Sequence, residues 1–192
     1  MAKTICLVHG VGFYDDKVTS PISVFAGKLH RATGAECIIH TWSHPGTPPN
    51  DTRSSFLFDD LRDWTYEILM DFTYVVENLA MLHAALPSAD MYVGHSGGGI
   101  IAASGTKPMV LMGCPMQLLR NIVRVAGIPA TLNLMHYRDP IAAPINVGTN
   151  VVLTRPISLL TYVNPVAAHT SYWKSDVVLK HVINWYKEKV EA

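Results

Sequence analysis

Short, largely apolar runs alternate along this chain with segments of helical periodicity, and this alternation constrains the fold more than any other feature. The runs lie at residues 4–10, 36–42, 91–95, 108–115, 130–139 and 150–155. Strands that read as continuous apolar runs are typical of a parallel sheet buried on both faces. The sequence therefore predicts an α/β fold: a three-layer sandwich with a roughly six-stranded, mainly parallel sheet and helices on both faces.

The segments between these runs carry the signals of helices. In 20–34, Ser20 can cap a helix, Pro21 suits its first turn and Gly34 can end it. Apolar residues recur at steps of three and four over 55–86, which fits one bent helix or two. Further helices are predicted directly after Ser96, over 116–127 and over 174–190.

Length and composition indicate one folded domain. The chain has 192 residues, of which 49% are hydrophobic and 16% charged, so a disordered protein is not expected. The formal net charge is zero and no predicted helix carries a basic stripe, which argues against a nucleic-acid partner.

The stretch over 116–127 is just long enough for a crossover between parallel strands. We therefore expect a single domain over 1–192 with no substantial lid.

The cysteines indicate a reducing compartment, and the helical segments bear on membrane insertion. Cys6, Cys37 and Cys114 are odd in number and lie in apolar runs, which favours buried free thiols over disulfides. No convincing signal peptide is found, and charged residues within 55–86 exclude a spanning helix there. We expect a cytoplasmic protein with no integral membrane segment.

The stretch "GHSGG" at 94–98 places a serine between a buried strand and a small-residue helix. In this G-x-S-x-G pattern, Gly94 and Gly98 let the strand turn sharply into the helix, because side chains there would make the two collide. The turn would lift the hydroxyl of Ser96 above the sheet edge. This context indicates a nucleophile.

With these features the sequence resembles the α/β-hydrolase superfamily, in the size range of small lipases and cutinase-like esterases. The resemblance rests on "GHSGG", on "HGVG" at 9–12, on "YRDP" at 137–140 and on "AAHTSYW" at 167–173. It covers nearly the whole chain as an order of elements, starting at what looks like the third strand of the full family sheet. The resemblance implies a serine hydrolase with a Ser-His-Asp triad.

The resemblance also implies the order of the triad, which is serine, then acid, then histidine. Asp139 is the first acid after Ser96 and lies at the end of the fifth strand. His169 lies in the predicted loop before the last helix, where it could reach the serine, whereas His181 falls inside that helix. We therefore assign Ser96 as nucleophile, His169 as base and Asp139 as the residue that orients His169.

Two backbone N–H groups are expected to form the oxyanion hole. One is that of Gly97, directly after the serine, and the resemblance points to Val11 for the other. His9 is expected either to orient the loop at 9–12 or to be an ordinary buried histidine. His95 adjoins Ser96, but its side chain should point away from the hydroxyl, so we interpret it as a packing residue.

The apolar segment before His169 offers candidate substrate contacts. They are Leu159, Leu160, Tyr162 and Val163, which could line an acyl pocket or belong to a buried short helix. His40 and His44 are four residues apart but span a strand end and a Pro-Gly loop, so no metal site is predicted. No cofactor is expected, and the sequence leaves the oligomeric state open.

Together these features predict a hydrolase that cleaves small-molecule carboxylic esters through an acyl-enzyme intermediate. A thioesterase, an amidase or an acyltransferase would use the same three residues, because fold and triad do not determine the leaving group. A binding module that keeps the hydrolase shape without turnover is the alternative from another class. The complete ordered set Ser96, Asp139 and His169 speaks against that alternative.

Overall fold

The fold was analysed in a computed structural model of the chain. The structure describes residues 2–10, 20–42, 72–103, 105–115, 130–145, 148–154 and 165–192. The helix predicted over 116–127, and with it the expected absence of a lid, lies outside these residues. The first part of the 55–86 segment also lies outside them.

Six strands form one sheet in the order β2-β1-β3-β4-β5-β6, and every neighbouring pair is parallel. The strands are β1 (Thr4–Val8), β2 (Glu36–His40), β3 (Met91–His95), β4 (Met109–Met112), β5 (Thr131–His136) and β6 (Thr149–Leu153). The inner strands β3, β4 and β5 are buried along their whole length, as their apolar sequences require. The predicted fold class, a parallel six-stranded α/β sandwich, is confirmed.

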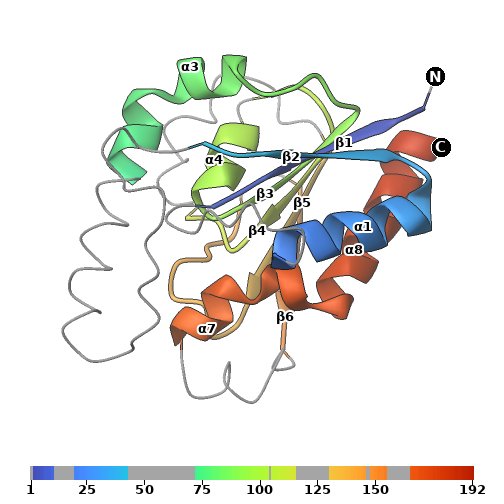
Figure 1. The fold of residues 1–192 in the computed structure, drawn as a ribbon. Coiled ribbons are helices and arrows are strands. Elements are labelled where there is room, and N and C mark those ends of the chain that lie inside the picture. Colours follow the sequence, from blue (N-terminus) through green and yellow to red (C-terminus); the bar gives the residue numbers. More distant parts are fainter. Residues whose placement is uncertain are drawn as a thin grey trace.

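Helices cover both faces of the sheet (Figure 1). On one face lie α1 (Pro21–Thr33), the 3₁₀ turn η1 (Tyr172–Lys174) and α8 (Asp176–Tyr186), and on the other lie α3 (Leu79–Ala84) and α4 (Gly97–Ala103). The short helix α7 (Pro165–Thr170) precedes η1, and a π-helical turn η2 (Lys187–Glu191) follows α8. The chain therefore has the three layers expected from its alternating pattern.

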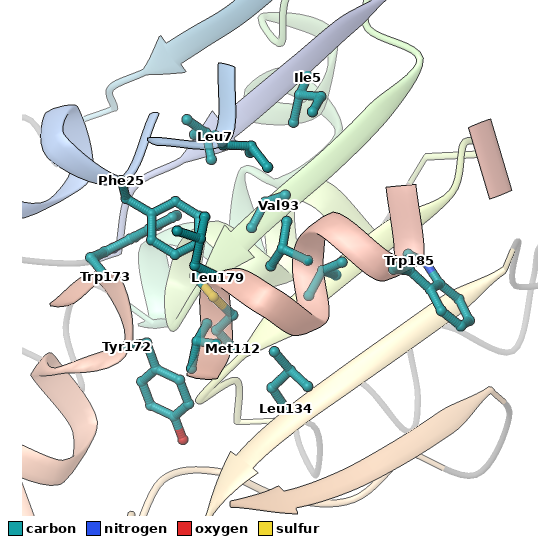
Figure 2. Close-up of a cluster of buried hydrophobic side chains, with 14 of the residues drawn as sticks. Ile5, Leu7, Phe25, Val93, Met112, Leu134, Tyr172, Trp173, Leu179 and Trp185 are labelled. Carbon is teal, nitrogen blue, oxygen red and sulfur yellow. The ribbon is translucent and has the colours of Figure 1, made fainter. Parts of the chain in front are cut away.

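Two apolar clusters fill the space between these layers, because successive side chains of a strand point to opposite faces. Leu7, Val93 and Leu134 pack with residues of α1, η1 and α8, as Figure 2 shows. Their strand neighbours on the opposite face, among them Cys6 and Tyr92, pack with α3 and α4. The rings of Phe25 and Trp173 meet edge to face, with centroids 5.2 Å apart, and so join α1 to η1.

The predicted helix signals at 20–34 are confirmed in detail. The Ser20 hydroxyl accepts a hydrogen bond from the Ser23 N–H at the start of α1. Gly34 ends the helix with a φ of 67°, in the left-handed region that glycine adopts at low cost. Within the segment at 55–86, the helical residues 72–77 are followed by a turn at Asn78, and α3 begins at Leu79.

Two expectations about burial and helix faces need correction. Cys37 is expected to be buried but is only partly so, because β2 lies at the edge of the sheet that the described strands form. The apolar pattern over 174–190 predicts a helix face made of Leu179, Val182, Ile183, Tyr186 and Val190. The buried face of α8 includes Val178 and Trp185 as well, whereas Ile183 and Val190 are only partly buried. Among the described residues no helix is long and apolar enough to cross a membrane.

Candidate active site

Ser96 lies directly after β3, at the carboxyl end of the sheet, where active groups of parallel α/β folds collect. Its φ is 54°, and within the described residues it is the only non-glycine with a positive φ. Its N–H donates to the carbonyl of Met112, and its own carbonyl accepts from the N–H of Gly99. These two bonds hold the chain in a strained corner, as the G-x-S-x-G pattern predicts.

Two glycines of the motif make this corner possible because each meets backbone where a Cβ would stand. A Cβ at Gly94 would lie 2.5 Å from the Cα of Gly99, which is the expected collision of strand with helix. A Cβ at Gly98 would overlap the carbonyl oxygen of His9, at the end of β1. The second glycine is therefore needed for the approach of α4 to β1 rather than to its own preceding strand.

His169 lies beside the serine, 73 residues further along the chain. Its Nε2 atom is 3.0 Å from the Oγ atom of Ser96, and the side chains of both residues are buried. His169 belongs to helix α7, so the prediction that it lies in a loop is wrong. Six residues that begin with proline are too short to show helical periodicity, which explains why the sequence pattern did not reveal this helix.

Asp139 completes a chain of hydrogen bonds. It lies in the turn after β5, where its N–H donates to the carbonyl of His136. Its Oδ1 and Oδ2 atoms are 3.1 and 3.0 Å from the Nδ1 atom of His169. Oδ1 also accepts from the N–H groups of Ile141 and Ala142, at 2.9 and 3.2 Å. The carboxylate is thus held by the backbone of its own turn while it faces the imidazole.

The environment of Asp139 keeps its carboxyl ionised. Burial alone would raise the pKa of Asp139, but hydrogen bonds and charge attraction from His169, together with donors from Ile141 and Tyr172, outweigh burial and lower this pKa. An ionised carboxylate can only accept, so the facing Nδ1 of His169 carries a proton. Nε2 is then free to accept the proton of the Ser96 hydroxyl.

Two residues that the sequence interpretation did not assign to the site support this arrangement. The Nε2 atom of His95 is 2.7 Å from the main-chain oxygen of His169, and burial lowers the pKa of His95 to about 3. Neutral His95 therefore donates to the backbone of His169, in addition to the expected packing. The hydroxyl of Tyr172 donates to Oδ2 of Asp139 at 2.9 Å. Tyr172 belongs to the stretch "AAHTSYW". The signal that could have pointed to it is that the hydroxyl of a buried tyrosine needs a hydrogen-bond partner.

The expected oxyanion donors are described in part. Gly97 is the first residue of α4, so its N–H has no acceptor within that helix. Val11 lies outside the described residues. The preceding Gly10 lies against the serine, because a Cβ on Gly10 would stand 3.0 Å from the Cβ of Ser96. His9 is hydrogen-bonded through Nδ1 to the carbonyl oxygen of Gly10, and burial lowers the pKa of His9.

The expected substrate contacts Leu159, Leu160, Tyr162 and Val163 lie outside the described residues. A cavity of about 220 Å³ lies elsewhere, between α1, η1 and the start of α8, and it contains none of the three triad candidates. Within the described part of the chain, no group of three histidine, cysteine or acidic side chains could hold a metal ion. His44, one of the two histidines considered for a metal, is not among the described residues.

The three cysteines are free thiols. Cys114 lies close beneath the corner, since a Cβ at Gly99 would overlap its sulfur. Burial raises the pKa of the Cys114 thiol to about 12, so it stays protonated at neutral pH. This leaves Ser96 as the nucleophile candidate at this corner.

Comparisons with known proteins add a likeness of fold. No family model and no curated protein matches the chain. Among solved structures it is similar to a protein from Xanthomonas campestris pv. campestris described as a "putative hydrolase of the alpha/beta superfamily". The two share 12% sequence identity over 98% of each chain, with a TM-score of 0.47. A likeness of this degree concerns the chain path and assigns no role to any residue.

Proposed function

We propose that this protein is a serine hydrolase that cleaves carboxylic esters of small molecules through an acyl-enzyme intermediate. The observation that carries the proposal is the hydrogen-bonded chain from the Oγ atom of Ser96, through both ring nitrogens of His169, to the carboxylate of Asp139. A serine hydroxyl becomes a useful nucleophile when a neutral imidazole takes its proton and a carboxylate holds that imidazole in the right tautomer.

In the proposed reaction the Oγ atom of Ser96 attacks the ester carbonyl while its proton moves to Nε2 of His169. The tetrahedral intermediate collapses as His169 gives this proton to the leaving alcohol, and the acyl group stays on Ser96. Water then attacks the acyl-enzyme and gives a proton to His169; the bond from the acyl carbon to Oγ of Ser96 breaks, His169 returns the proton to Oγ, and the acid is released. Asp139 stays ionised and stabilises the imidazolium that forms in both steps.

We assign the oxyanion hole to the N–H groups of Gly97 and Val11. The position of Gly97 at the start of α4, where its N–H has no acceptor within the helix, and the contact of Gly10 with Ser96 support this assignment. Two such donors aimed at the developing charge can each lower the barrier by about 3 kcal/mol. The acyl group is proposed to lie against the apolar residues Leu159, Leu160, Tyr162 and Val163.

A fluorophosphonate probe tests the nucleophile directly. We expect the wild-type protein to be labelled at Ser96, as read by peptide mass spectrometry, and Ser96→Ala to lose both labelling and ester turnover. Ser171→Ala is the matched control, because Ser171 is also a buried serine but donates to the carbonyl of Ala168. A wild-type protein that the probe leaves unlabelled would refute the proposal and favour a binding module.

The class of substrate is tested with nitrophenyl esters of rising acyl length, run beside thioesters of the same acyl groups. We expect the esters to be turned over with a higher kcat/KM than the thioesters. A clear preference for thioesters would overturn the ester assignment while leaving the triad in place.

A further inference from the structure

We propose that Tyr172 is a positioning residue of this site, whose hydroxyl holds the carboxylate of Asp139 in line with His169. The inference rests on the proposed function, since it concerns the residue that orients the base.

The direction of the Tyr172 hydroxyl is determined by its two partners. The N–H of His136 lies 2.7 Å from the phenol oxygen and can only donate to it. Oδ2 of the ionised Asp139 lies 2.9 Å away and can only accept. The single phenol proton must therefore point at Asp139. Burial, followed by the negative charge of Asp139, raises the pKa of Tyr172, so the phenol keeps this proton.

The ring of Tyr172 is held on several sides, which leaves the hydroxyl little freedom. It is fully buried, its centroid lies 5.5 Å from that of His95, and it belongs to the cluster between the sheet and α8. Figure 2 shows the ring at the margin of that cluster, with its oxygen pointing away from the other labelled side chains. A Cβ at Gly113 would stand 2.8 Å from the ring and 2.7 Å from Oδ2 of Asp139.

The donors around Asp139 divide between its two oxygens. The N–H groups of Ile141 and Ala142 bind Oδ1, so the turn anchors only one side of the carboxylate. Tyr172 is the donor that, together with His169, engages Oδ2. Without the phenol, Oδ2 would have His169 alone among these donors, and the plane of the carboxylate would no longer be fixed. We infer that Tyr172 aligns the carboxylate and also weakens the attraction of the carboxylate for the protonated imidazole.

Tyr172→Phe keeps the ring and removes the hydroxyl. We expect kcat to fall about tenfold with little change in KM, because a hydrogen bond to a charged group is lost at the reacting centre and not in substrate binding. We also expect the acid limb of the kcat/KM profile to move up by about half a pH unit. A carboxylate with one donor fewer holds the protonated base more strongly.

A second substitution keeps the experiment decisive if the phenylalanine variant folds poorly. Incorporation of 3-fluorotyrosine at position 172 keeps the hydroxyl and makes it a stronger donor, so the acid limb should move to lower pH. Tyr186→Phe is the control, because it removes the hydroxyl of another buried tyrosine of the same cluster and should leave kcat and the acid limb unchanged. Thermal unfolding of each variant shows whether it is folded.

The outcomes separate this inference from the proposed function. If the wild-type protein neither reacts with the fluorophosphonate nor hydrolyses an ester, the proposed function fails and the inference falls with it. If the wild-type protein is active, an acid limb that stays in place in the Tyr172 variants overturns the inference alone. A Tyr172→Phe enzyme with the wild-type kcat would do the same.

Discussion

Replacement of Asp139 by asparagine separates the shape of this residue from its charge. In the structure, Oδ1 accepts from two backbone N–H groups, those of Ile141 and Ala142. These donors would select the amide oxygen of the asparagine, so its NH₂ group would take the place of Oδ2. There it would lie about 3 Å from Nδ1 of His169 and could only donate to it.

The magnitude follows from this exchange of donor and acceptor. Nδ1 of His169 would accept from this NH₂ group, which places the ring proton on Nε2, facing the Oγ atom of Ser96 at 3.0 Å. This tautomer cannot take the serine proton. To restore the productive tautomer, the site would lose the hydrogen bond from the NH₂ group and bring two N–H groups face to face. The acceptor left for the Nδ1 proton is then the neutral amide oxygen at the Oδ1 position, 3.1 Å away, in place of a charged carboxylate. The cost is roughly 5 kcal/mol, the sum of a lost bond and a buried unpaired donor, which corresponds to about a 10⁴-fold loss of kcat.

The assay is ester turnover, compared with the rate of fluorophosphonate labelling and with thermal unfolding. We expect both rates to fall by about four orders of magnitude while the variant stays folded, since asparagine satisfies the same turn. Asp176→Asn is the control, because Asp176 is the other aspartate after Ser96 and its exposed side chain pairs only with Lys28 among the ion pairs of the described residues. If Asp139→Asn kept turnover within about tenfold of wild type, Asp139 would not be the residue that orients the base.

Two further predictions concern stability. Gly98→Ala should destabilise the fold by about 3 kcal/mol or more, because its Cβ would overlap the carbonyl oxygen of His9. Gly27→Ala in α1 should instead stabilise the fold by about 0.5–1 kcal/mol, because a Cβ there would make an ordinary contact with the end of the Arg31 side chain, at 3.6 Å. Chemical unfolding compares the two variants, and equal stability would contradict the close approach at Gly98. His95 is neutral in the fold with a pKa of about 3, below its ordinary value of 6.5, so the unfolded state binds its proton first. Its contribution to stability should therefore be intact above pH 6.5 and be lost at about 1.4 kcal/mol per pH unit as the pH falls toward 3. His95→Gln should show a shallower decline between pH 6.5 and 5 in urea unfolding, and an unchanged slope would speak against a buried neutral histidine.

The alternation of strands with helices and the corner at Ser96 could be anticipated because both depend on short-range patterns. Apolar runs and helix caps are local signals, and they predicted a parallel sheet between helices. The glycines of "GHSGG" are equally local, since Gly94 and Gly98 sit two residues on either side of the serine. The interpretation was weaker where an element was short, as for α7, or where a segment lay at a sheet edge, as for Cys37 in β2.

The partners of the triad candidates could not be predicted, because they come from contacts between residues far apart in the chain. His95 meets the backbone of His169 across 74 residues, and Tyr172 meets Asp139 across 33. Chain order could single out Asp139 as the acid, but it carries no information about the donors that surround it. Those donors decide the chemistry: a buried carboxyl without them would be protonated, and a protonated carboxyl could not hold the imidazole as a base. The role proposed for Asp139 therefore depends as much on its turn and on Tyr172 as on the aspartate itself.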